Sequence, residues 1–126
     1  MKIRTDFVTN SSSSSFILAF QTEKDFENFQ NDCAEYGYRL LLKYIKKRMK
    51  QKTVTNKEEA MHMLDVFRSE MDDETYAENK KRIEEAEIIF QDTIWDSEGG
   101  LLEWAIRNDF LLCEFHEYCL ISCNVG

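Results

Sequence analysis

The apolar positions of the chain alternate with polar ones or form short runs near its two ends, which predicts strands there. Residues 2–8 alternate and form the first expected strand, and residues 16–20 (FILAF) are a short apolar run typical of a buried strand. The tail, residues 110–125, is rich in strand formers. Its pattern fits either a hairpin that turns at His116 and Glu117 or a single bent strand.

The middle of the chain shows the helical period instead. A capping-box pattern begins at Thr22, and the apolar stripe that follows passes Gly37 and ends near residue 50. We expect one helix there, bent at Gly37 because glycine weakens a helix by about 1 kcal/mol relative to alanine. A second capping box at Thr55 predicts the start of the next helix. The stripe of the first helix consists of Phe26, Phe29, Cys33, Tyr36, Leu41, Ile45 and Met49.

A third helix is expected after the acidic residues 72–74, whose charge suits the positive end of a helix. Its inward positions continue to Phe90 and Ile94, so the pattern predicts a helix up to that point. A glycine pair within residues 96–100 predicts a turn, and a short helix over residues 101–107 follows.

These elements predict a mainly helical α+β fold. Three to four helices pack on a face of a small antiparallel sheet that the N-terminal and C-terminal strands form. The length of 126 residues suits a single domain, residues 1–126, and the apolar fraction of 43% supplies its core. The absence of proline leaves long helical stretches uninterrupted, and the presence of only four glycines argues against an all-β sandwich.

The formal net charge of −8 is distributed unevenly. Residues 39–52 carry seven basic side chains and no acid, which leaves nine basic and 24 acidic residues elsewhere, a balance of −15. The predicted contacts to a protein partner are Lys43, Lys46, Lys47 and Lys50. The abundance of acids favours the competing interpretation, in which these lysines pair with carboxylates on neighbouring helices. The negative charge also argues against nucleic-acid binding.

The chain is expected to be cytoplasmic. It contains no apolar run of about 20 residues, the length needed to span a membrane, so no membrane contact is expected. Polar residues follow the basic start of the chain, where a signal peptide requires an apolar region. In a reducing compartment the four cysteines are free thiols or metal ligands rather than disulfides.

The most specific pattern for chemistry lies near the C-terminal end, where Cys113, His116, Cys119 and Cys123 follow one another closely. Three thiolates and an imidazole are a ligand set for tetrahedral zinc. In an unbent strand the outer sulfurs are about 33 Å apart, so a metal requires the segment to fold back. The spacing favours the alternative that these cysteines fill the core as small apolar residues.

Candidate catalytic groups are weaker. Glu114 and Glu117 raise the pKa of nearby thiols, which argues against a nucleophile made of Cys113 and His116. Carboxylates are abundant, but no acids gather in the sequence as they do in a metal-dependent hydrolase. We therefore predict no catalytic residue and no cofactor, with zinc as the one alternative.

The segment from Phe7 to Phe16, FVTNSSSSSF, resembles a leader shared by many short bacterial and prophage proteins of the form F-V-[ST]-N-S-S-S-S-S-F. The resemblance covers about 17 residues from Met1 and implies a bacterial or prophage source and a natural N-terminus. It implies no activity, so no functional residue is carried over. Residues 9–15 are interpreted as a flexible, solvated, serine-rich segment.

These observations favour a small, non-enzymatic, cytoplasmic protein that binds another macromolecule. The alternatives are a zinc-binding module and a hydrolase with a carboxylate site that the sequence does not show. A homo-oligomer is compatible with all three.

Overall fold

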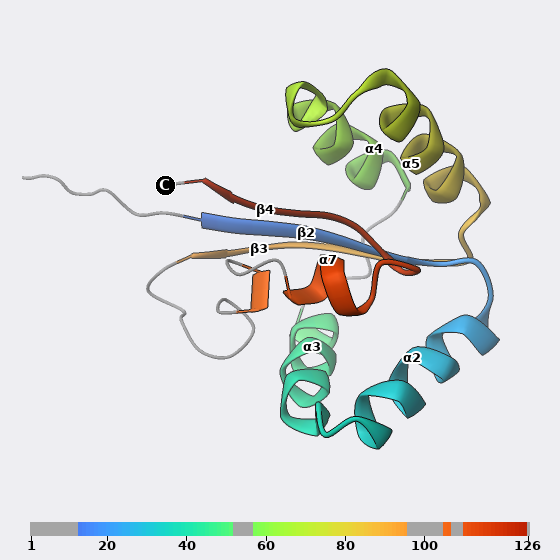
Figure 1. Cartoon of the computed structure of the whole chain (residues 1–126), viewed down its shortest axis with the longest axis vertical. Coiled ribbons are helices and arrows are strands. Elements are labelled where there is room, and N and C mark those ends of the chain that lie inside the picture. Colours follow the sequence, from blue (N-terminus) through green and yellow to red (C-terminus); the bar gives the residue numbers. More distant parts are fainter. Residues whose placement is uncertain (1–12, 52–56, 96–104, 107–109, 126) are drawn as a thin grey trace, which may run out of the picture.

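The computed structural model describes residues 13–51, 57–95, 105–106 and 110–125. Figure 1 shows these elements in their arrangement in space. In chain order they are β2 (Ser13–Phe20), α2 (Glu23–Glu35), α3 (Arg39–Gln51), α4 (Lys57–Val66), the 3-10 turn η1 (Arg68–Glu70), α5 (Asp73–Glu85), β3 (Ile88–Trp95), α7 (Phe110–Glu114) and β4 (Cys119–Val125). None of the helices in these ranges has both the length and the apolar composition that crossing a membrane requires.

The described strands form one antiparallel sheet in the order β3-β2-β4, with β2 in the middle. Along β3 the register runs from Phe20 opposite Ile88 to Ser13 opposite Trp95. Along β4 the register shifts between Ile17 and Leu18 of β2. The mainly helical α+β class that the sequence predicts is confirmed.

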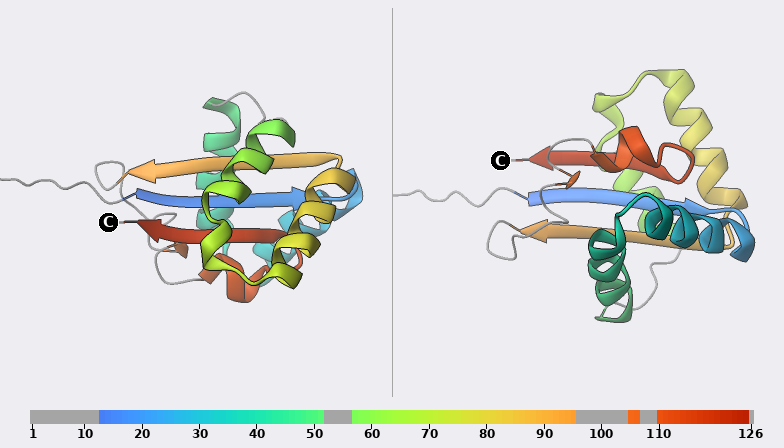
Figure 2. Two further views of the ribbon diagram at one scale, coloured as in Figure 1. Left: turned by 90° about the horizontal axis from the view of Figure 1, so that it is seen from above. Right: turned by 60° about the horizontal axis from the view of Figure 1, so that its bottom comes forward.

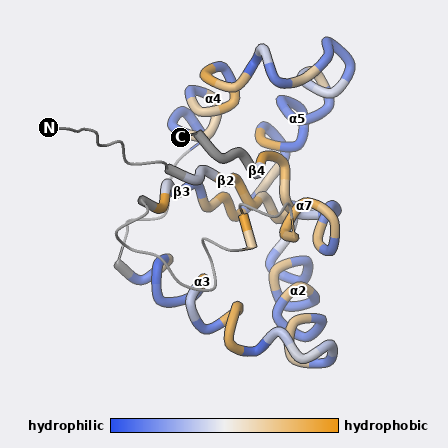
Figure 3. Tube along the Cα trace, turned by 60° about the vertical axis from the view of Figure 1, so that its left-hand side comes forward, coloured by the Kyte–Doolittle hydropathy of each residue, from blue (hydrophilic) through white to orange (hydrophobic). Residues whose placement is uncertain are grey.

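Helices cover both faces of the sheet, whereas the sequence analysis expected them on a face. Figure 1 shows the sheet edge-on between α4 and α5 above and α2, α3 and α7 below, and Figure 2 gives the view from the α4 and α5 side. Phe16, Leu18 and Phe20 of β2 lie in one core cluster, and Ile17 and Ala19 lie in the other. Burial on both faces explains why residues 16–20 are apolar without alternation. Figure 3 shows hydrophobic residues along the strands of the sheet.

The prediction of a third helix that reaches Ile94 was wrong. α5 ends at Glu85, and residues 88–95 form the strand β3. Phe90 and Ile94 were read as one face of a helix, but a spacing of four also places two residues on one face of a strand. The β-branched and aromatic side chains of this segment favour the strand.

The tail is neither a hairpin nor a single bent strand. Residues 110–114 form the short helix α7, and a turn at residues 116–118 leads into β4. The expected strand at residues 2–8, the cap at Thr55 and the turn at residues 96–100 lie outside the described residues. Of the short helix expected over 101–107, the structure describes residues 105–106, which are helical.

The capping box at Thr22 is confirmed, because its side chain accepts a hydrogen bond from Asp25 N and the carboxylate of Asp25 accepts one from Thr22 N. The stretch expected as one bent helix is divided at Gly37, which adopts a φ of 83° between α2 and α3. Only glycine takes this left-handed conformation without strain. Tyr36, predicted on the inner stripe, is 65% exposed because α2 ends before it.

The end of the serine tract is a buried strand rather than a flexible segment. Ser13–Ser15 open the central strand, and the side chains of Ser14 and Ser15 are buried. The hydroxyl of Ser15 is 2.9 Å from that of Thr93 on β3. A serine can replace an apolar residue there because its hydroxyl finds a partner within the sheet. Residues 9–12 lie outside the described residues.

Candidate functional site

Helix α3 brings the four predicted contact lysines together on one groove. Leu41 and Ile45 face the core, and this orientation turns the four lysines of the helix outward. The groove has a volume of about 470 Å³. We call it the basic groove, and it is lined by Arg39, Leu42, Lys43, Lys46, Lys47 and Lys50.

The cations of the basic groove are not neutralised by the part of the chain that the structure describes. α3 contains six basic residues and no acid. The ion pairs within the described residues include Lys24 with Glu27, Arg48 with Asp92 and Arg68 with Asp73, and none of these residues lines the groove. Within this part of the chain no ion pair joins Lys43, Lys46, Lys47 or Lys50 to an acid, and their pairing with acids on neighbouring helices stays a prediction.

The sixth basic residue, Arg48, points the other way and holds α3 on the sheet. Its Nε donates to Asp92 Oδ2 at 2.7 Å, and Asp92 is completely buried on β3. Its guanidinium also donates to the carbonyl oxygen of Thr93 at 3.4 Å, and Asp92 Oδ1 accepts from Thr93 N at 2.8 Å. A charged pair with further hydrogen bonds fixes both the position and the rotation of the helix.

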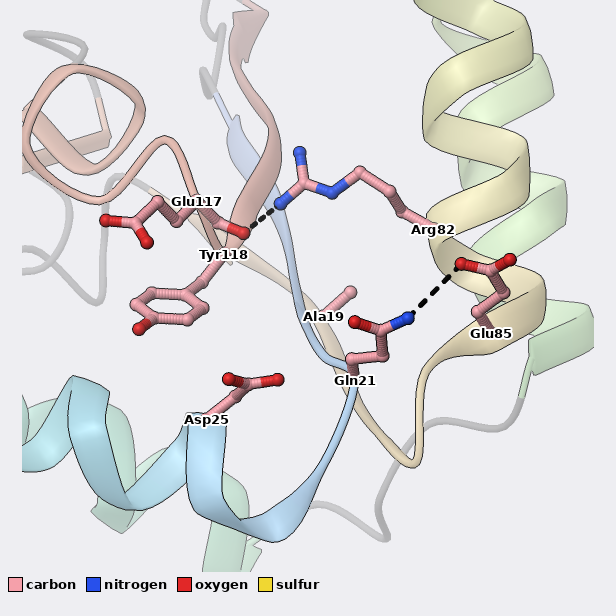
Figure 4. A pocket seen from close by; sticks show the side chains of 7 residues that line it. All are labelled: Ala19, Gln21, Asp25, Arg82, Glu85, Glu117 and Tyr118. Carbon is pink, nitrogen blue, oxygen red and sulfur yellow. Dashed lines mark hydrogen bonds between the residues drawn. The ribbon is translucent and has the colours of Figure 1, made fainter.

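A second hollow, of about 220 Å³, lies where α2, α5 and the segment before β4 approach the end of β2 (Figure 4). Arg82 reaches into it and donates to the carbonyl oxygens of Glu117 and His116. Burial lowers the pKa of the Arg82 guanidinium below its ordinary value. The hollow is lined by Ala19, Gln21, Asp25, Arg82, Glu85, Glu117 and Tyr118.

Two of the three acids of this hollow already have structural partners. Asp25 belongs to the capping box of α2, and Glu85 accepts from Gln21 Nε2 at 3.3 Å. Burial raises the pKa of the Tyr118 hydroxyl, and the negative charges of nearby acids, with Glu117 the strongest among them, raise it further. A carboxylate site of a hydrolase would need acids that converge on a metal or a water. Two of the three carboxylates here instead stabilise local structure.

The residues of the predicted zinc site differ in their exposure to solvent. Cys113 is exposed on α7 and His116 is exposed in the following turn, whereas Cys119 is buried and its thiol donates to Ile121 O at 3.3 Å. The backbone of Cys123 lies opposite Ser15 in β4, and its side chain is outside the described residues. The described side chains contain no group of three or more metal-ligating residues. Zinc binding stays a prediction.

Two kinds of residue at these sites were not predicted from the sequence. Arg39 and Leu42 also line the basic groove, and the helical spacing of residues 39, 42, 43, 46, 47 and 50 could have found them. The residues that line the hollow of Figure 4 come from separate segments of the chain, so no local sequence pattern predicts it. Comparison of the chain with models of protein families, with curated proteins and with solved structures gives no significant match.

Proposed function

We propose that this protein acts by binding an acidic protein partner through the basic groove, without catalysing a reaction. The observation that carries the proposal is a row of five basic side chains that no described acid neutralises. Like charges three or four residues apart on a helix destabilise it by about 0.2–0.5 kcal/mol per pair. A partner that brings carboxylates to the groove removes this repulsion and gains charge-assisted contacts.

The distribution of charge supports a protein partner rather than a nucleic acid. Residues 39 to 50 extend about 16 Å along the helix axis, while the chain outside residues 39–52 carries a balance of −15. A long polyanion that follows the groove also approaches this negative surface. A short acidic segment can bind all the lysines over a length of about 16 Å, which is two Debye lengths at physiological salt. Such a segment ends before it extends over the negative surface.

The proposal is tested with a fluorescently labelled peptide of glutamate and serine as the ligand and anisotropy as the readout. We expect saturable binding to the wild-type protein that weakens with added salt. The double variant Lys43→Glu with Lys47→Glu should lose at least tenfold in affinity, about 1.4 kcal/mol. The matched control is Lys80→Glu with Lys81→Glu on α5, which changes the net charge equally at two exposed lysines outside the groove.

Two results would contradict the proposal. Equal losses in the groove variant and in the α5 control would mean that the net charge, and not the groove, governs binding. Tighter binding to a duplex DNA oligonucleotide than to the peptide at the same salt concentration would assign the groove to nucleic acid instead. Far-UV circular dichroism of all variants checks that each one is folded.

A further inference from the structure

An exposed apolar ridge lies beside the basic groove on the same helix. Leu40 is 55% exposed and Tyr44 is 39% exposed, and Tyr36, four residues before Leu40, is 65% exposed. Scattered exposed apolar residues are ordinary on protein surfaces. Leu40 and Tyr44 nevertheless lie four residues apart on α3, and this spacing places them next to each other on one face of the helix. We call Leu40 and Tyr44, which both belong to α3, the apolar ridge.

The ridge and the groove share a border. At about 100° per residue, Leu40 and Tyr44 differ by about 40° around the helix axis, and Lys47 lies about 20° from Leu40 on the side of the groove. Lys43 follows about 40° further round. The two lysines therefore stand between the apolar ridge and the remaining cations of the groove, which are Arg39, Lys46 and Lys50.

We propose that the acidic partner is an amphipathic helix whose apolar side chains cover Leu40 and Tyr44 while its carboxylates bind Lys43 and Lys47. This inference rests on the function proposed above and names the form of the partner. A helix that carries acids beside an apolar stripe matches the two neighbouring stripes of α3 in chemistry and in spacing. The apolar contact gives an affinity that salt does not remove, and the charges orient the partner.

The other surfaces that carry anions fit this combination less well. A nucleic acid can stack a base on Tyr44 but has nothing to place on Leu40, because an aliphatic side chain offers neither a hydrogen bond nor an aromatic face. A membrane of anionic lipid attracts a basic stripe with apolar neighbours. It also repels the remainder of this chain, which carries a balance of −15.

The test compares two labelled peptides of equal length and equal charge. One carries leucines in a helical stripe beside its glutamates, and the other carries serines at those positions. We expect the leucine peptide to bind wild-type protein about five- to tenfold more tightly, with a difference that persists at high salt. The variant Leu40→Ser with Tyr44→Ser should remove this difference and leave the binding of the serine peptide unchanged. Val66→Ser, at an exposed residue of α4, is the matched control.

The outcomes separate this inference from the proposed function. If neither peptide binds, the proposed function fails. If both peptides bind equally, or if the ridge variant binds both as the wild type does, the groove recognises charge alone and the inference is wrong. Binding to phosphatidylglycerol vesicles that exceeds binding to the leucine peptide, and that the ridge variant loses, would replace the protein partner with a lipid surface.

Discussion

The buried pair of Arg48 and Asp92 allows the sharpest test of how α3 is held in place. Asp92 is fully buried, and the Arg48 side chain, which is 22% exposed, contacts it at 2.7 Å. Removal of one member of a buried pair costs about 3–5 kcal/mol, because the other charge stays in a medium of low dielectric constant. Arg48→Met removes the guanidinium and puts an unbranched apolar side chain in place of the aliphatic part of the arginine. We expect a loss of about 3 kcal/mol, at the lower end because water reaches the arginine.

Two further variants separate the charge from the packing. The double variant Arg48→Met with Asp92→Leu removes both charges, and replacing a buried pair by apolar residues is often neutral. It should therefore regain most of the stability that the single variant loses. Lys46→Met, at an exposed position of the same helix, should change the free energy of unfolding by no more than about 0.5 kcal/mol.

Urea unfolding followed by far-UV circular dichroism measures these differences at neutral pH. A loss of 3 kcal/mol is a large share of the roughly 5–15 kcal/mol by which domains are stable. If Arg48→Met matched Lys46→Met, the pair would not hold α3. If the double variant were as unstable as the single one, the loss would come from packing around the arginine and not from the buried carboxylate.

Two other predictions concern single groups. A hydrogen bond from Thr75 N lowers the pKa of Asp72 at the start of α5, so its charge stabilises the fold above the unfolded pKa of about 3.9 and less as the pH falls. The stability advantage of the wild type over Asp72→Asn in urea should therefore shrink below about pH 3.9, and a constant difference would contradict this account. Burial raises the pKa of Cys33 to about 12, so iodoacetamide at neutral pH should modify the exposed Cys113 first. Peptide mapping should find Cys33 and Cys119 modified only after unfolding, and equal rates would refute the burial of these thiols.

Local patterns predicted the parts of the fold that depend on neighbouring residues. The cap at Thr22 needs only residues three positions away, and the burial of Leu41 and Ile45 follows from the period of one helix. The strand β3 was missed because the spacing of Phe90 and Ile94 suits both periods. The β-branched and aromatic composition of the segment favours the strand, and its pairing with β2, more than 60 residues earlier in the chain, fixes it.

The same distinction holds for the candidate site. Lysines 43, 46, 47 and 50 lie on a single helix, so their common face could be predicted from their spacing. Whether acids neutralise them depends on which helices pack beside α3, and that is a property of the tertiary structure. The role of Arg48 was hidden for the same reason, because its partner Asp92 is 44 residues away in β3.

The central position of β2 has a consequence for how the chain folds as it is synthesised. β2 lies near the N-terminus, yet its neighbours in the sheet are β3 and β4, and β4 ends at Val125. At about 5–20 residues per second the ribosome needs on the order of ten seconds to make the chain between β2 and β4. Until β3 is made, both edges of this apolar strand are unpaired outside the ribosome, and one edge stays unpaired until β4 is made. The described sheet is completed only after β4 emerges, so chaperones have time to bind the nascent chain, and deletion of β4 removes the partner of one whole edge of the central strand.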